Sequence, residues 1–197
     1  YSGGYGTLRN PYQISTVQDW LTLIEKEGDW DKYFALMNDI DFEGTEITPI
    51  GVSLVDFENE LFHQVPFDGC FDGNGHVLSN LNLTGCSFEA VGVFGYVGFE
   101  GHILNLVIEG AAVNGTDDVG VLCGYNQGTI DRCYSIGTVL GEDSVGGLVG
   151  YNQGTIDRCY SAGTVLGERS VGGLVGANGG TIHHCYAEGI FTGSGDF

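Results

Sequence analysis

The residues that could do chemistry in this chain recur at one fixed spacing. Arg132 and Arg158 each follow an aspartate, Asp131 and Asp157, and a pair of histidines occupies the same place one repeat later. Hydrolysis or elimination on a polysaccharide would need carboxylates and a basic residue gathered on one exposed face. Because these residues recur with the repeat, we interpret them as structural. We therefore predict no catalytic residue and no enzyme activity.

Cysteine and acidic residues are the other candidates. One cysteine recurs in each repeat, and stacked repeats would place these thiols about 4.8 Å apart with side chains pointing the same way, which disfavours a disulfide. The predicted column of free thiols is Cys133, Cys159 and Cys185. Acidic residues gather at one expected corner, where Ca²⁺ could relieve their repulsion, but a solvated edge without any cofactor is the favoured interpretation. These residues are Asp117, Asp118, Glu142, Asp143 and Glu168.

The elements that carry these residues are three copies of a 26-residue unit. The copies span residues 119–144, 145–170 and 171–196; the second matches the first at 22 of 26 positions, and the third matches the second at 14 of 26. Each unit holds three short apolar runs bounded by Gly, Asn, Asp or Ser and shows no helical period. Stacking such units at ~4.8 Å describes a parallel β-helix. We therefore predict an all-β parallel β-helix with three-strand rungs of about 26 residues.

Stacking would align equivalent residues of the three copies. One predicted ladder is formed by amide side chains that can hydrogen-bond from rung to rung. It consists of Asn126, Asn152 and Asn178. An aromatic ladder consists of Tyr134, Tyr160 and Tyr186.

The phrases GLVGYNQGTI and GLVGANGGTI resemble the GLUG repeat of secreted bacterial and archaeal surface proteins. The resemblance covers residues 119–196 well and residues 91–118 loosely. It implies a right-handed β-helix and an extracellular setting. GLUG repeats accompany adhesins, cell-wall proteins and one class of immunoglobulin-cleaving metallopeptidase. The His-Glu-x-x-His zinc motif of that peptidase is absent here, so its activity does not carry over.

A single domain of 197 residues is expected. Residues 1–32 form an extended segment and a capping helix, residues 33–118 form irregular or degenerate rungs, and residues 119–197 form the repeats. Ser15 and Gln18 fit a capping box at the start of the helix. The expected apolar face of the helix consists of Val17, Trp20, Leu21 and Ile24. Residues 51–66 read as a loop or an excursion from the coil.

The composition of the chain disfavours several classes of binding partner. The formal charge of −20, from 26 acidic and six basic residues, disfavours nucleic acid and anionic membranes. No apolar run approaches the ~20 residues of a membrane span, so no membrane insertion is expected. Because the chain starts at Tyr1 rather than Met, we expect a cleaved signal peptide and an extracellular or cell-surface location.

Three positions are candidates for glycosylation. Asn82 and Asn114 begin Asn-x-Thr sequons, and Ser144 lies in an Asp-Ser-Val sequence similar to a bacterial O-glycosylation signal. Sugars on such turns would face solvent.

Strict alternation leaves the run VGGLVGYN open to two interpretations. If Leu148 and Asn152 point inward, Val149 and Tyr151 form an outward apolar stripe that could contact another copy or a ligand. If Leu148 and Asn152 point outward, Val149 and Tyr151 belong to the core.

The leading hypothesis for function is a secreted, non-catalytic structural or adhesive solenoid that associates end to end with copies of itself. It rests on the near-identical repeats and on the lack of a capping sequence after the third copy, since an open β-helix end is a template for another chain. The alternatives are a carbohydrate-binding or carbohydrate-cleaving module, with glycans as partners, and a spacer within a larger adhesin.

Overall fold

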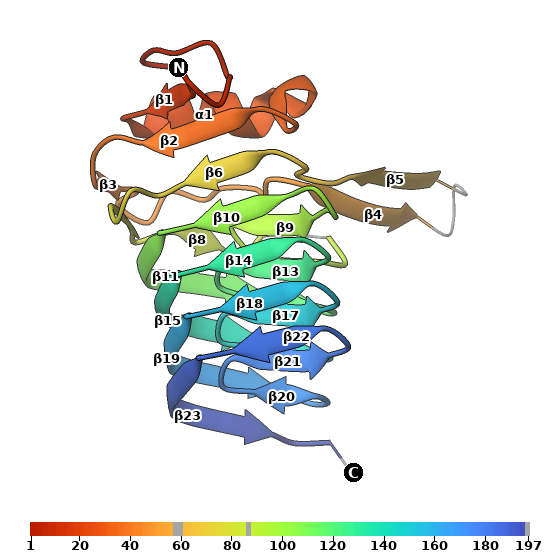
Figure 1. Cartoon of the computed structure of the whole chain (residues 1–197). Coiled ribbons are helices and arrows are strands. Elements are labelled where there is room, and N and C mark those ends of the chain that lie inside the picture. The colour runs from red at the N-terminus through yellow and green to blue at the C-terminus, as the bar shows by residue number, and fades with distance from the viewer. Residues whose placement is uncertain (57–60, 86–87, 196–197) are drawn as a thin grey trace.

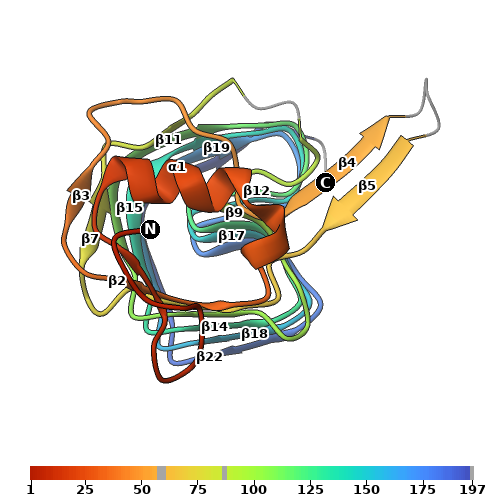
Figure 2. The same cartoon turned by 90° about the horizontal axis from the view of Figure 1, so that it is seen from above.

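The computed structural model describes residues 1–56, 61–85 and 88–195. The chain winds into a parallel β-solenoid of about six turns with one short α-helix at its N-terminal end (Figure 1). Seen from above, the chain runs clockwise as it moves away from the viewer, so the coil is right-handed (Figure 2). The predicted all-β solenoid with an N-terminal helix is confirmed.

Four stacks of parallel strands form the walls. The first stack contains β1 (Tyr12–Ile14), β2 (Tyr33–Leu36), β6 (Cys70–Asp72), β10 (His102–Leu104), β14 (Thr129–Asp131), β18 (Thr155–Asp157) and β22 (Thr181–His183). The second contains β3 (Ile40–Asp41), β7 (Val77–Ser79), β8 (Asn82–Leu83), β11 (Val107–Asn114), β15 (Tyr134–Leu140), β19 (Tyr160–Gly167) and β23 (Tyr186–Gly193). The third contains β12 (Val119–Gly120), β16 (Val145–Gly146) and β20 (Val171–Gly172). The fourth contains β9 (Phe94–Val97), β13 (Cys123–Asn126), β17 (Val149–Asn152) and β21 (Val175–Asn178).

Each repeat contributes four strands rather than the predicted three. The run VGGLVGYN bends at Gly147 and Leu148, which separates β16 from β17. The run TIDRCYS breaks after Asp157, because Arg158 adopts a φ of 51° and turns the chain. The remainder of that run joins the next one in the eight-residue strand β19.

The register between repeats is constant. In the first stack Thr129 pairs with Thr155, and Thr155 pairs with Thr181. The spacing of 26 residues therefore places equivalent residues directly above one another. Apolar side chains from all four stacks fill one continuous interior.

The helix α1 (Val17–Glu25) closes the N-terminal end of the coil (Figure 2). Its N-cap is Thr16, whose hydroxyl accepts from the Asp19 backbone N–H at 3.1 Å while the Asp19 carboxylate accepts from the Thr16 N–H at 3.2 Å. The predicted Ser15–Gln18 box is thus wrong by one residue, since the carboxylate of Asp19 also reaches the Ser15 N–H at 3.0 Å. A short 3₁₀ helix, η1 (Glu27–Asp29), follows.

Trp20 and Leu23 are the helix residues that enter the core, each with no exposed surface. The predicted face residues Val17, Leu21 and Ile24 are only partly buried against it. One further element leaves the coil within residues 51–66, where β4 (Val52–Asp56) and β5 (Leu61–Val65) form an antiparallel hairpin that projects sideways (Figures 1 and 2). Within the described ranges, no helix has the length and hydropathy needed to span a bilayer.

Candidate functional site

A hollow lies on the outer face of the first stack, where β1, β2 and β6 meet the N-terminal loop. Gln13 pairs with Ala35, and Ala35 pairs with Asp72, so these three outward residues lie in one row across the strands. The methyl group of Ala35 is the smallest side chain of that row and leaves a depression of about 350 Å³. The lining residues are Leu8, Pro11, Gln13, Tyr33, Phe34, Ala35, Met37, Cys70, Asp72 and Asn74.

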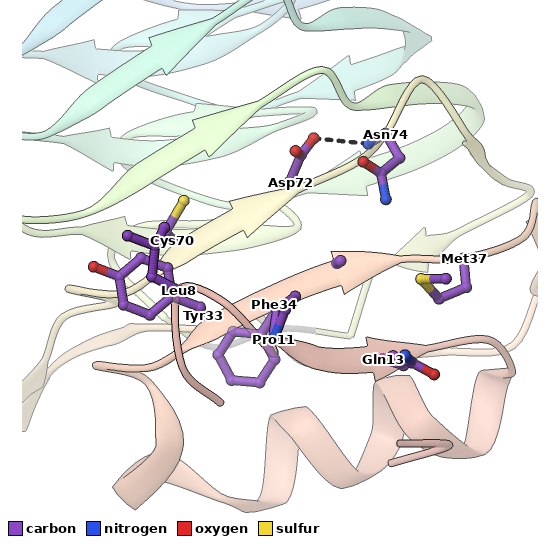
Figure 3. Close-up of a pocket in the computed structure, with 10 residues that line it drawn as sticks. Leu8, Pro11, Gln13, Tyr33, Phe34, Met37, Cys70, Asp72 and Asn74 are labelled. Atoms are coloured by element: carbon purple, nitrogen blue, oxygen red, sulfur yellow. Dashed lines mark hydrogen bonds between the residues drawn. The ribbon is translucent and has the colours of Figure 1, made fainter. Parts of the chain in front are cut away.

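The walls of the hollow differ in chemistry (Figure 3). Tyr33 lies at one side and Met37 at the other, with 36% and 40% of their surfaces exposed. Asp72 Oδ1 accepts from the Asn74 N–H and from Asn105 Nδ2, both at 2.9 Å. The Asn74 amide donates to the Leu36 carbonyl at 2.9 Å. These bonds fix the two polar side chains and leave Asp72 Oδ2 and Asn74 Oδ1 without a partner among the described residues.

The asparagine side chains form a continuous hydrogen-bonded column. Asn126 Nδ2 donates to Asn152 Oδ1, and Asn152 Nδ2 donates to Asn178 Oδ1, both at 2.7 Å. Asn126 and Asn152 are fully buried, whereas Asn178 lies exposed in the last turn. The column therefore gives hydrogen-bond partners to the two buried amides, Asn126 and Asn152, and ends at the exposed Asn178.

The tyrosines form two stacked columns, of which the sequence analysis named one. Tyr134, Tyr160 and Tyr186 stack with ring centroids 4.7 and 5.5 Å apart. The second column contains Tyr96, Tyr125 and Tyr151, with centroids 5.1 and 5.4 Å apart. In both columns the inner ring faces cover one another, so the columns present mainly ring edges to solvent.

The proposed outward stripe of Val149 and Tyr151 does not exist as one surface. Val149 is fully buried, as are Leu148 and Asn152, while Tyr151 is half-exposed. The reason is that β17 bends inward against the preceding turn: a Cβ at Gly150 would overlap the backbone of residues 118 and 119. Strict alternation therefore fails here, because both sides of the strand are covered.

The cysteine column consists of free thiols. The Cys133 N–H donates to Cys159 Sγ, and the Cys159 N–H donates to Cys185 Sγ, both at 3.4 Å. Cys133 and Cys159 are buried, and Cys185 is half-buried in the last turn. Burial raises the pKa of the Cys185 thiol, which keeps it protonated and poorly reactive. Cys86 lies outside the described residues.

The repeated Asp-Arg pairs form a zigzag of ion pairs between turns. Arg158 Nη2 contacts Asp157 at 2.9 Å and Asp131 of the preceding turn at 3.1 Å. Arg132 contacts Asp131 at 3.0 Å, and His184 Nδ1 contacts Asp157 at 3.0 Å. Both arginines bind carboxylates along this corner, and His184 contacts one of the same carboxylates. This geometry joins turns and gathers no acid–base pair around a cleft.

The acidic corner remains open rather than forming a cage. Arg169 Nη2 reaches Asp143 at 3.3 Å, and Glu142 and Glu168 are exposed. Throughout residues 1–56, 61–85 and 88–195, no group of three or more His, Cys, Asp or Glu side chains could hold a metal ion. Asp118 is half-buried, as is Asp143, and it differs from the other acidic residues of the corner in its positive φ of 38°.

Asp118 should make the stability of the protein depend on pH. Desolvation, with smaller contributions from Asp117, Asp143 and Glu89, raises its pKa to about 6. In the unfolded chain its pKa is about 3.9, so between pH ~4 and ~6 the folded state binds more protons and the free energy of unfolding falls as pH rises. We expect Asp118→Asn to stabilise the protein at pH 7 by up to ~3 kcal/mol and to flatten this dependence. Asparagine also tolerates the positive φ.

Urea unfolding at pH 4.5, 6 and 7.5 measures this effect. The exposed Glu142→Gln substitution removes one charge from the same corner and serves as the control, with little expected change. An Asp118→Asn variant that keeps the wild-type pH dependence would contradict the assignment.

The glycosylation candidates occupy different environments. Asn82 is half-buried, and its Oδ1 accepts from Thr84 Oγ1 at 2.7 Å. Asn114 is exposed at the end of β11. Ser144 is half-buried at a φ of 48° and donates its N–H to Asp143 Oδ1 at 2.8 Å. Asn114 is thus the most accessible of the three.

The hollow over Ala35 was missed at the sequence level. Its walls come from residues 8–13, 33–37 and 70–74, which precede the recognisable repeats. The alternation of Tyr33, Ala35 and Met37 with buried neighbours indicates that these three residues share one outward face of β2. The sequence does not indicate that β2 pairs with β1 and β6.

Known proteins share the repeats of this chain. The family model of the GLUG motif matches residues 141–166 and 167–192. Halomucin from Haloquadratum walsbyi is 34% identical over 145 residues, which are 69% of this chain and 2% of halomucin. A protein named "Putative Gly-rich membrane protein" from Evansella cellulosilytica is 33% identical over 141 residues, 67% of this chain and 15% of that protein. The chain thus spans a small part of both relatives.

A solved structure shares the fold. The crystal structure of a protein named as a putative immunoglobulin A1 protease from Bacteroides ovatus superposes with a TM-score of 0.80 at 25% identity. The match covers 99% of this chain and 62% of that protein. The family match and the similarity to halomucin confirm the resemblance predicted from GLVGYNQGTI and GLVGANGGTI. Residues 141–192 are two GLUG motifs, and this chain is a GLUG-repeat protein.

Proposed function

We propose that this chain is a non-catalytic structural or adhesive β-solenoid of the cell surface or extracellular space, which associates end to end with further copies of itself. A similar protein is named a membrane protein, and another is a halomucin, which supports a surface role. The protease name of the structural neighbour is the contrary indication. The titratable side chains of the repeats, which bind one another along the corner, support the non-catalytic part of the proposal.

The observation that carries the proposal is the uncovering of the core at the last turn. Val149 and Ile156 are fully buried, whereas their equivalents Val175 and Ile182 are only partly buried. Phe191 packs its ring over Gly173 but keeps 40% of its surface exposed. An apolar surface bordered by unpaired strand edges favours the addition of another β-turn, which a following segment of the same chain or another copy can supply.

The N-terminal end of the solenoid also exposes apolar residues, but in a loop rather than at a strand edge. The edge of β1 is covered by an antiparallel bridge between Gly3 and Gln13, and α1 lies over the core. The N-terminal loop nevertheless exposes Tyr5 by 79% and Leu8 by 73%. Contact between this end and the last turn of the next copy would be heterologous and would grow into a filament. Contact between two last turns would instead close at a dimer.

Sedimentation velocity over a range of protein and salt concentrations tests the association. Copies with a formal charge of −20 repel one another, so we expect assembly to strengthen as salt screens that charge. Ile190, 64% exposed on β23, is the residue to change: Ile190→Asp should prevent assembly. Leu140→Asp is the matched control, because Leu140 is an apolar residue 40% exposed on an internal turn. Monomers under all conditions would overturn the proposal. In that case a further segment of a longer chain would cover the last turn.

A further inference from the structure

We propose that the hollow over Ala35 binds one ring of a neutral carbohydrate. The hollow lies on the side of the solenoid, formed by β1, β2 and β6, away from the last turn (Figures 1 and 3). The inference does not depend on the last turn, although Leu8 of the N-terminal loop lines the hollow and also belongs to the surface proposed for end-to-end association.

The first argument is that Tyr33 is partly exposed and, among the described residues, has no stacked aromatic neighbour. In the two tyrosine columns each inner ring is covered by its neighbours at 4.7 to 5.5 Å. Tyr33 instead pairs in register with Cys70 and has no stacked aromatic partner among the described residues. One face of many pyranose rings carries only C–H groups, and such a face packs on an uncovered aromatic ring. Tyr33 is therefore suited to a sugar in a way that the stacked tyrosines are not.

The second argument is the arrangement of hydrogen-bond acceptors on the other side of the row. Asp72 Oδ1 is occupied by the Asn74 N–H and Asn105 Nδ2 at 2.9 Å, which holds the carboxylate in place. Asp72 Oδ2 and Asn74 Oδ1 remain as acceptors without a described partner. Sugar hydroxyls donate to such groups without bringing a charge into the hollow. An apolar wall with a few fixed polar groups is the usual composition of a small-molecule site.

The third argument concerns charge and size. Asp72 lies in the hollow, and a smaller depression of about 120 Å³ beyond Tyr33 is bordered by Asp31, Asp68 and Glu100. These carboxylates repel uronic or sialic acids, so the sugar should be uncharged. The volume of about 350 Å³ lies at the low end of the ~300–1,000 Å³ typical of ligand pockets, which suits a single ring. The rest of a glycan would extend into solvent.

Two-dimensional ¹H–¹⁵N NMR titration of the full chain tests the proposal. The probes are the methyl glycosides of glucose, galactose, mannose and N-acetylglucosamine, with glucuronic acid as the anionic counterpart and butylammonium as the cationic one. We expect at least one neutral glycoside to bind in the millimolar range and to shift amides of residues 33–37 and 70–74. Ala35→Leu fills the hollow, and Tyr33→Ala removes its wall. Each should weaken binding at least tenfold.

Tyr134→Ala is the matched control, because Tyr134 belongs to a stacked column outside the hollow and its loss should leave binding unchanged. Unchanged spectra with all four neutral glycosides would overturn the proposal. Binding that survives Ala35→Leu would also overturn it. Binding of butylammonium alone, weakened by salt, would mean that the hollow takes a cation instead.

Discussion

Replacing Asn152 with alanine should lower the free energy of unfolding by about 3 kcal/mol. The side chain accepts from Asn126 and donates to Asn178 at 2.7 Å, and it is fully buried. Its loss removes the shorter of the two hydrogen bonds that the buried Asn126 amide donates, leaving the one to the Gly128 carbonyl at 3.4 Å, and an unpaired buried N–H costs about 1–3 kcal/mol. The cavity left by the missing amide adds to this cost.

Urea unfolding followed by circular dichroism measures the loss, at a protein concentration where the chain is monomeric. Asn178→Ala is the matched control. Asn178 occupies the same repeat position, but it lies exposed in the last turn and makes only one amide–amide bond. Its removal also takes away the acceptor of the Asn152 amide, but water can replace that acceptor at the exposed last turn, so we expect a cost of no more than about 1 kcal/mol. Equal losses in the two variants would show that the buried ladder does not stabilise the coil.

Replacing Trp20 with alanine should be still more damaging, at about 3–5 kcal/mol. The Trp20 ring has no exposed surface and contacts Phe42, Phe71 and Phe94 at centroid distances of 6.0, 5.5 and 6.3 Å. It is the main side chain through which α1 covers the first turns. Alanine would leave a large cavity under the helix and loosen the cap.

Trp20→Phe provides the matched control for this effect. Trp20 Nε1 is buried and has no hydrogen-bond partner in the described part of the chain, so phenylalanine loses part of the volume but no described hydrogen bond. We therefore expect it to cost roughly half as much as alanine or less. The measurement is again urea unfolding, together with hydrogen exchange of the amides in β2 and β6, which should exchange faster in Trp20→Ala. A small loss in Trp20→Ala would contradict the role of α1 as a cap.

The repeats made most of the architecture predictable. A constant period of 26 residues can stack only in register, so the asparagine, tyrosine and cysteine columns follow from the sequence once the β-helix is inferred. The number of strands was harder to predict. It depends on the bend at Gly147 and Leu148, which splits one run into β16 and β17. The boundary between β18 and β19 depends on Arg158 adopting a positive φ, a conformation that arginine seldom takes and that composition does not reveal.

Two further features depended on contacts between distant segments. The burial of Val149 results from β17 bending against the preceding turn, which a single repeat cannot indicate. The hollow over Ala35 needs the pairing of β1, β2 and β6, which lie outside the recognisable repeats.

The helix begins one residue later than predicted because Asp19 accepts from two backbone N–H groups, at Ser15 and Thr16. Local sequence placed the helix, while a buried carboxylate fixed its first residue.

Negative-stain electron microscopy of the purified chain at neutral pH and moderate salt tests the central claim most directly. If the uncovered last turn is the surface on which the next copy stacks, the images should show unbranched fibres whose axial repeat matches the length of one molecule. The Ile190→Asp variant should show none. Dispersed single particles of the unmodified chain at every concentration and salt would contradict the account.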